Sequence, residues 1–164
     1  KFTPNLITTL SLITGLIALV LLYKFSIIGF IIFFIASYFF DVMDGYYARK
    51  YKMITKFGDY YDHIKDIIVF ILFTVILIFK YKVFNNPEVI LIYIILFIGV
   101  FFQYSCQEKY YARKKNMNIA FGKIKKLCFS KPEKIMRVSR YLSSGTLIIY
   151  SCIVVIYLKY TQSL

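Results

Sequence analysis

Four stretches of this chain run for fifteen residues or more without a charged side chain, and they limit the folds open to it. Two of them, residues 6–23 and 89–106, are almost wholly apolar and close to the length that crosses the hydrocarbon core of a bilayer. The chain as a whole is 60% hydrophobic, with a mean hydropathy of +0.67. Backbone groups in lipid must pair within their own segment, so such stretches are expected to be helices.

These stretches predict an all-α fold, a polytopic membrane helix bundle in which five transmembrane helices can be located. A third helix is expected to begin within an acidic region and to continue as an apolar run. The whole chain, residues 1–164, is expected to form a single domain. The five expected spans lie near residues 6–23, 26–40, 64–79, 89–106 and 142–158.

The formal charge of +13 has two explanations, nucleic-acid binding or the concentration of Lys and Arg in cytoplasmic loops. If the N-terminus, the loop after the second span and residues 107–140 share one side, that side holds 17 of the 21 basic residues. The asymmetry predicts a multi-pass protein with this side in the cytoplasm. It requires no nucleic acid, and membrane lipids are the expected surroundings.

Cysteine and histidine give little support to a metal site of the zinc type. The three cysteines have no metal-ligand spacing, and their odd number argues against a disulfide framework. We interpret Cys106, Cys128 and Cys152 as packing residues. His63 is the only histidine, which excludes a zinc site built from several histidines.

Five of the eight acidic residues, all of them aspartates, lie within residues 41–66. Asp41 and Asp44 are three residues apart and share a helix face; Asp62 and Asp66, four apart, share one on the next helix. A short connection makes these helices antiparallel neighbours, so the two pairs are expected to converge. Four facing carboxylates repel unless cations neutralise them, and oxygen ligands suit Mg²⁺ or Mn²⁺ completed by substrate phosphates.

The residues between the two pairs fit a site for a diphosphate. Gly45 and Ala48 keep one helix face small, Arg49 offers a planar fork for phosphate, and Gly58 relieves crowding where the third helix begins. Each also has a structural explanation, because small residues serve helix packing and an arginine can anchor a cytoplasmic helix end.

Together these residues form the pattern D-x2-D-G-x2-A-R-x8-G-x3-D-x3-D without a gap. The pattern resembles the signature of the CDP-alcohol phosphotransferase family. Pro4, Asn5 and Thr8 in the opening of the first span are similar to the P-N-x-x-T start of that family. The resemblance implies transfer of a phosphoalcohol unit from a CDP-linked donor to an alcohol acceptor, with release of CMP. The family usually has six core helices, so the resemblance implies five to six transmembrane helices, the last of which is expected to be missing from the single domain.

The resemblance also implies roles for individual residues and partners. The metal would be one or, more in keeping with the family, two Mg²⁺ or Mn²⁺ ions, and Asp66 would take the proton of the acceptor hydroxyl. The partners would be a CDP-linked lipid or alcohol donor, an alcohol acceptor and a second copy of the chain in a homodimer. The metal ligands would be Asp41, Asp44, Asp62 and Asp66, and the substrate contacts Asn5, Thr8, Gly45, Ala48, Arg49, Thr55 and Gly58.

Several alternatives stay open on the sequence. The favoured reaction uses CDP-diacylglycerol and a small polar alcohol such as inositol, glycerol phosphate or serine. His63, directly after Asp62, resembles the choline and ethanolamine phosphotransferase branch, in which CDP-choline or CDP-ethanolamine reacts with diacylglycerol and a histidine is a candidate base. Two further hypotheses do not make the protein an active enzyme: it could be a divalent-cation transporter or an inactive structural relative of the family. The uncharged fourth and fifth spans and the complete signature argue against them.

Overall fold

The computed structural model describes residues 3–113, 127–128, 135–137 and 140–162, and the regular structure within them is helical. These residues belong to two compact units. The first contains Lys1–Pro87 together with Ser151–Leu164, and the second contains Glu88–Tyr150. The prediction of an all-α fold is confirmed.

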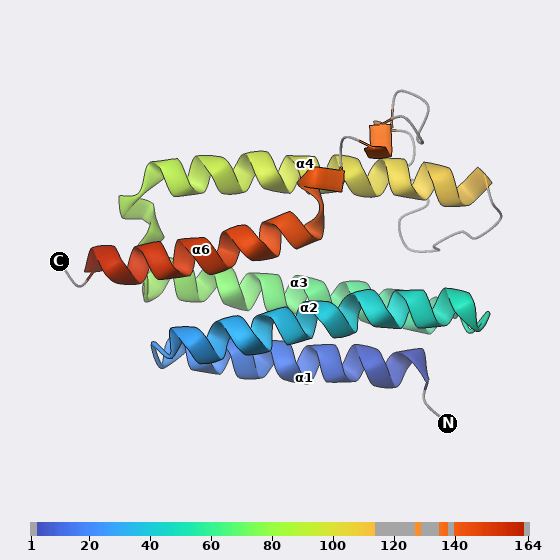
Figure 1. The fold of residues 1–164 in the computed structure, drawn as a ribbon, viewed down its shortest axis with the longest axis horizontal. Helices are drawn as coiled ribbons and strands as arrows, with labels where there is room; N and C mark the ends of the chain where they lie inside the picture. The colour runs from blue at the N-terminus through green and yellow to red at the C-terminus, as the bar shows by residue number, and fades with distance from the viewer. Residues whose placement is uncertain (1–2, 114–126, 129–134, 138–139, 163–164) are drawn as a thin grey trace. The chain divides into compact units, whose positions relative to one another are not determined.

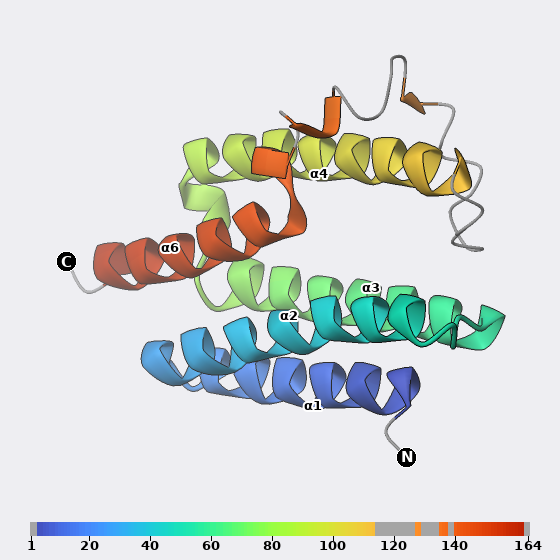
Figure 2. The ribbon, with the colours of Figure 1, turned by 45° about the vertical axis from the view of Figure 1, so that its right-hand side comes forward.

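Three long helices make up most of the first unit: α1 (Pro4–Tyr23), α2 (Ile27–Lys50) and α3 (Lys56–Phe79). Short turns join them, so each runs antiparallel to the one before (Figures 1 and 2). The C-terminal end of α2 and the N-terminal ends of α1 and α3 therefore lie at the same end of this unit. Both α2 and α3 are longer than the apolar runs that predicted them, because the helical backbone continues through the aspartates.

Local sequence signals set where two of these helices begin. Thr3 is extended, its hydroxyl accepts a hydrogen bond from the Leu6 amide, and Pro4 follows in the first helical position. Thr55 is also extended, and its hydroxyl accepts a hydrogen bond of 3.0 Å from the Gly58 amide. The two threonines satisfy amides that have no partner inside their helices.

Small polar residues bring α1 and α2 close together. The Ser11 hydroxyl donates to the Ser37 carbonyl at 2.9 Å, and the Ser37 hydroxyl donates back to the Ser11 carbonyl at 2.8 Å. One turn along α1, a Cβ added at Gly15 would lie 3.0 Å from the Ser37 Oγ atom. Small residues and interhelical hydrogen bonds of this kind pack helices where lipid supplies no hydrophobic drive.

Aromatic side chains hold α2 against α3 further along the same helices. Phe73 stacks on Phe30 and Phe34, with ring centroids 6.0 and 5.5 Å apart. Beyond the end of α3, the buried Tyr81 hydroxyl donates to the Leu22 carbonyl at 3.1 Å. These contacts fix the register of α1, α2 and α3 relative to one another. The same register determines which residues meet at the other end of the three helices, where the aspartates lie.

The outer faces of the helices are apolar. Ile28 is 77% exposed and Phe79 78% exposed, values that suit side chains in contact with lipid. Within the described ranges, four helices are long and apolar enough to cross a membrane: Pro4–Tyr23, Ile27–Lys50, Pro87–Gln107 and Ser144–Thr161. The third predicted span is helical, but the charged residues in the first turns of α3 keep it out of this group. Membrane crossing thus follows from composition for four of the predicted spans.

The second unit contains α4 (Pro87–Arg113) and the first turns of α6 (Ser144–Gln162), which continues into the first unit from Ser151. The Tyr150 hydroxyl donates to the Val89 carbonyl at 3.3 Å, and the Tyr150 ring meets Tyr93 edge to face. A Cβ added at Gly99 would lie 3.0 Å from the Leu142 Cβ atom, so this glycine permits close packing. Most of the basic loop predicted at residues 107–140 lies outside the described residues.

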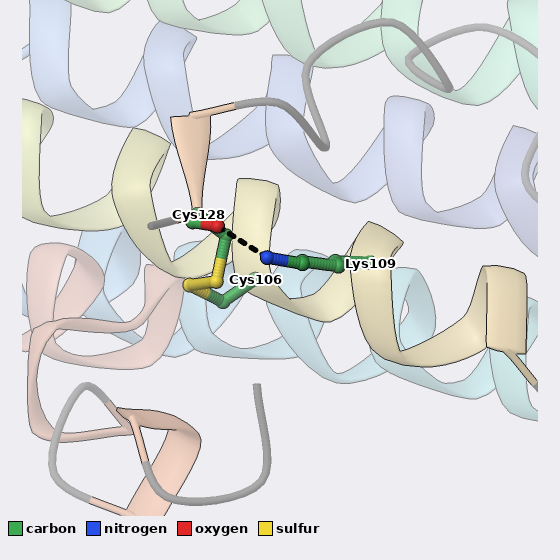
Figure 3. Close-up of a disulfide and its surroundings, with 3 residues drawn as sticks. All are labelled: Cys106, Lys109 and Cys128. Carbon is green, nitrogen blue, oxygen red and sulfur yellow. Dashed lines mark hydrogen bonds between the residues drawn. A yellow bond between two sulfur atoms is a disulfide. The ribbon is translucent and has the colours of Figure 1, made fainter. Parts of the chain in front are cut away.

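A disulfide between Cys106 and Cys128 corrects the interpretation of all three cysteines as packing residues (Figure 3). The two Cα atoms are 5.0 Å apart although 22 positions separate the residues in the sequence. The Lys109 ammonium donates to the Cys128 carbonyl at 2.6 Å and ties the same segment to α4. An odd number of cysteines excludes complete pairing but not one pair. Cys152 is free and buried, as a packing residue should be.

Candidate metal and substrate site

The site is built from the polar ends of α2 and α3. Asp41 lies in the third turn from the end of α2, and Asp62 and Asp66 lie in the second and third turns of α3. One carboxylate oxygen from each of the three lies within 4.8 Å of the others. The antiparallel register thus confirms the predicted convergence of the two helices for these three residues, which we call the aspartate triad.

Asp44 lies beside the aspartate triad rather than in it. Its side chain is buried at 4% exposure, with the Thr8 hydroxyl of α1 in hydrogen-bonding reach and its charge facing Asp62 and Asp41. Among the described residues, no group donates a hydrogen bond to its Oδ2 atom. A buried carboxylate oxygen without a donor is costly, and a cation is one way to satisfy it. Metal ligation by Asp44 stays a prediction.

Lys65 is the residue at this site that the sequence analysis missed. Its side chain is 2% exposed, and its ammonium forms ion pairs with Asp41, with Asp62 Oδ1 at 3.1 Å and with Asp66 Oδ1 at 3.0 Å. It also donates to the Ser11 hydroxyl of α1 at 3.2 Å. The signal was present, since Asp62 and Lys65 are three residues apart on one helix.

Asn5, Thr55 and Gly58 come together where α1 and α3 begin. A Cβ added at Gly58 would lie 2.8 Å from the Asn5 Oδ1 atom and 3.0 Å from the Thr55 hydroxyl, so a side chain there would displace them. A hydrogen bond of 3.1 Å between the Thr9 and Tyr61 hydroxyls joins the same two helices. Three of the predicted substrate-binding residues are therefore close neighbours in the structure.

Gly45 and Arg49 lie together near the end of α2. A Cβ added at Gly45 would come within 3.2 Å of both terminal guanidinium nitrogens of Arg49, which folds back over the glycine. The absence of a side chain at Gly45 thus sets where the guanidinium lies. Ala48, between them in sequence, is half-buried, and its carbonyl accepts the Met53 amide at 2.8 Å.

His63 is oriented by Asp59, one turn earlier on α3. The His63 Nδ1 atom lies 2.6 Å from the Asp59 carbonyl oxygen and 3.9 Å from its carboxylate. A carbonyl only accepts hydrogen bonds, so Nδ1 carries the hydrogen and Nε2 is the basic nitrogen of the neutral ring. His63 directly follows Asp62 in α3, so its backbone lies next to the aspartate triad.

The donor set fits a hard divalent cation. The aspartate triad offers carboxylate oxygens, which Mg²⁺ and Mn²⁺ prefer, and the described part of the chain contributes no histidine or thiol to it. The buried Asp62 Oδ1 atom has Lys65 as an ionic neighbour but receives no well-formed hydrogen bond from the described residues. Its remaining capacity is available to a metal ion.

The comparisons with known proteins agree with the motif. The family model for CDP-alcohol phosphatidyltransferase matches residues 1–160, nearly the whole chain and all of the site described above. Searches among curated proteins and among solved structures returned no match. The chain therefore belongs to the CDP-alcohol phosphatidyltransferase family, which consists of transferases.

Proposed function

We propose that the protein transfers a phosphatidyl group from CDP-diacylglycerol to a small polar alcohol of the inositol, glycerol phosphate or serine type and releases CMP. The observation that carries the proposal is the aspartate triad at the ends of two antiparallel helices in a chain of this family. Oxygen ligands suit an ion that also takes diphosphate oxygens, and the apolar outer faces suit a substrate with acyl chains.

The membrane placement follows from charge. We assign the site end of α1–α3 to the cytoplasmic side, because the predicted order of the spans puts 17 of the 21 Lys and Arg residues on that side. A lipid donor would reach it sideways from the bilayer, and a water-soluble alcohol would reach it from the cytosol. A site at the boundary serves both substrates, and a homodimer is the assembly we expect.

Asp41, Asp62 and Asp66, with Asp44 beside them, would hold the divalent ions. When bound, these ions supply positive charge that neutralises the diphosphate and the charge developing on departing CMP. Arg49, placed by Gly45, would pair with a phosphate of the donor. Asn5, Thr8, Ala48, Thr55 and Gly58 would shape the pocket for the CDP moiety, with Thr8 acting in part through Asp44.

Asp66 would act as the general base. At 50% side-chain exposure it is the most open member of the aspartate triad, so an acceptor hydroxyl can approach it. The hydroxyl oxygen attacks the phosphorus that carries diacylglycerol, its proton passes to Asp66, and the bond from that phosphorus to the CMP oxygen breaks.

The test is CMP release by the purified chain in lipid with Mg²⁺ or Mn²⁺, across a panel of CDP donors and alcohol acceptors. One pairing should be active, and Asp62→Asn and Asp66→Asn should each lower its rate at least about 100-fold. Glu88→Gln, an acidic residue outside the site, is the control and should keep the wild-type rate. No CMP from any pairing, or active Asn variants, would refute the proposal.

One observation favours a second candidate, transfer from CDP-choline or CDP-ethanolamine to diacylglycerol. His63 is oriented through Nδ1 by Asp59 beside the aspartate triad, as a base acting through Nε2 should be. His63→Ala separates the two candidates in the same assay. A loss of less than about threefold favours Asp66 as the base, whereas a loss of about 100-fold or more favours His63.

A further inference from the structure

The buried ammonium of Lys65 lies at the centre of the acidic site. It faces three carboxylates from two helices and a hydroxyl from a third, which are Asp41, Asp62, Asp66 and Ser11. The ammonium donates hydrogen bonds to Asp41 and Ser11 and forms ion pairs with Asp62 and Asp66. Its side chain is 2% exposed, whereas the carboxylates of Asp62 and Asp66 are 30% and 50% exposed. The carboxylates thus open to the surface while the ammonium lies beneath them.

The ammonium and a metal ion would use the same oxygens. The residues of the aspartate triad that could hold an ion together are the same three that pair with Lys65. A Mg²⁺ ion binds oxygen at about 2.0–2.1 Å, so an ion bound to all three would lie among the oxygens that surround Nζ. Two cations cannot share that space, because they overlap sterically and repel each other at a few ångströms.

Lys65 also explains how three carboxylates can lie within 4.8 Å of one another before any ion binds. Neighbouring carboxylates repel strongly when they are partly buried, and a buried charge requires a partner. The ammonium provides opposite charge from within the chain. Divalent ions would then replace an internal cation rather than enter an uncompensated acidic site.

We propose that Lys65 holds the place of a divalent cation in the metal-free protein and is displaced when the ion binds, so that it lowers and sets the metal affinity of the site. The inference rests on the metal site of the proposed function. The ion enters from the exposed side of the carboxylates, and Ser11 offers the departing ammonium a hydroxyl acceptor on the buried side.

The experiment measures Mn²⁺ binding to the purified, metal-stripped full chain without substrate, by the electron paramagnetic resonance signal of free Mn²⁺. Lys65→Met and Lys65→Gln remove the charge and should bind Mn²⁺ at least about tenfold more tightly than the wild type. Lys65→Arg keeps the charge and should bind no more tightly than the wild type. Lys50→Met makes the same charge change at an exposed position at the end of α2 and should stay within about twofold.

Thermal unfolding provides a second readout that also reports whether the variants fold. In EDTA, Lys65→Gln should unfold at a lower temperature than the wild type, because its carboxylates lack their counter-ion. Mn²⁺ should raise its unfolding temperature by more than it raises that of the wild type. If Lys65→Met does not fold, the comparison of the neutral Lys65→Gln with the charged Lys65→Arg still tests the proposal.

The outcomes separate this inference from the proposed metal site. If the wild type binds Mn²⁺ and the neutral variants bind it equally or more weakly, the displacement inference is wrong and the metal site stands. If neither the wild type nor the neutral variants bind Mn²⁺, both are wrong. Binding that is weak or absent in the wild type and strong in the neutral variants supports both.

Discussion

The two ends of the α1–α3 bundle both carry lysines, but the surroundings of the lysine ammonium groups differ between the two ends. At the site end, the Lys65 ammonium is buried among carboxylates. At the other end, the Lys80 ammonium lies over the rings of Tyr23 and Phe25, 4.3 and 4.6 Å from their centroids. A lysine over aromatic rings is typical of a membrane–water boundary, where the apolar stem and the charge each meet a suitable neighbour. The end of the bundle that carries the candidate site is therefore the one at which a lysine charge is buried.

The interactions that hold the chain together also differ between the two ends. Lys80, Tyr81 and Lys82 turn the chain from α3 into the short η1 helix (Val83–Asn85), and the buried Tyr81 hydroxyl holds that turn to α1. The Lys159 ammonium donates to the Phe25 carbonyl, a further tie at this end. The hydrogen bonds there close turns, whereas the ion pairs at the site end hold acidic groups together. We expect substitutions at the site end to change activity and those at the other end to change stability.

The largest effect is expected from Asp41→Asn, which removes charge from the aspartate triad. The rate of CMP release should fall about 100-fold or more, because one carboxylate ligand and one partner of Lys65 are weakened together. Lys24→Gln changes the charge by one unit at the opposite end and should leave the rate unchanged. Similar rates for the two variants would remove the functional distinction between the ends.

A smaller loss is expected from Gly58→Ala. The added Cβ would displace Asn5 and Thr55, so kcat/KM for the CDP donor should fall about 10- to 100-fold with little change in unfolding temperature. Gly29→Ala is the matched control at the other end, since its Cβ would meet the movable side-chain ends of Leu21 and Ser26 at 3.0 Å. Full activity in Gly58→Ala would count against the placement of Asn5 and Thr55 in the donor pocket.

Tyr81→Phe tests the turn at the other end. Loss of the hydrogen bond to Leu22 should lower the free energy of unfolding by about 1 kcal/mol at pH 8, with activity retained. Equilibrium unfolding in denaturant measures the change. A fall in CMP release without a fall in stability would contradict the assignment of this end to structure.

The same variant makes a pH prediction. Burial raises the pKa of the Tyr81 phenol from 10.0 to about 12, so the folded state favours the neutral form. The stability from this neutral form is complete below pH 10 and is lost as the pH rises from 10 to about 12, because the unfolded phenol ionises first. The difference in stability between the wild type and Tyr81→Phe should therefore shrink between pH 8 and pH 11. A constant difference would show that the buried phenol does not titrate in this way.

The smallest effect is expected from Lys80→Gln, which removes the cation over the rings of Tyr23 and Phe25. Exposed contacts of this kind contribute about 0.5–1 kcal/mol, so unfolding should shift slightly and CMP release should not. The shift should be larger in lipid than in detergent if the contact anchors this end at the bilayer surface. A change in catalytic rate would contradict the separation of the two ends.

Much of this architecture could be predicted from the chain alone. Uncharged apolar runs of bilayer length predict helices because lipid offers the backbone no other partners. The spacing of Asp41, Asp62 and Asp66 predicts their meeting, since helical periodicity and one short turn leave few alternatives. The family follows from the same residues and is confirmed over residues 1–160.

Only the tertiary structure decided which of the charged residues and cysteines lie in contact with one another. Asp44 fits the helical spacing as well as Asp41 does, but packing against α1 buries it beside Thr8 and outside the aspartate triad. Cys106 and Cys128 are 22 residues apart, and no periodicity predicts their pairing. Lys65 lies among the carboxylates because Ser11 on α1 and Asp41 on α2 both reach its ammonium. Periodicity acts within one helix, whereas these contacts depend on how three helices pack.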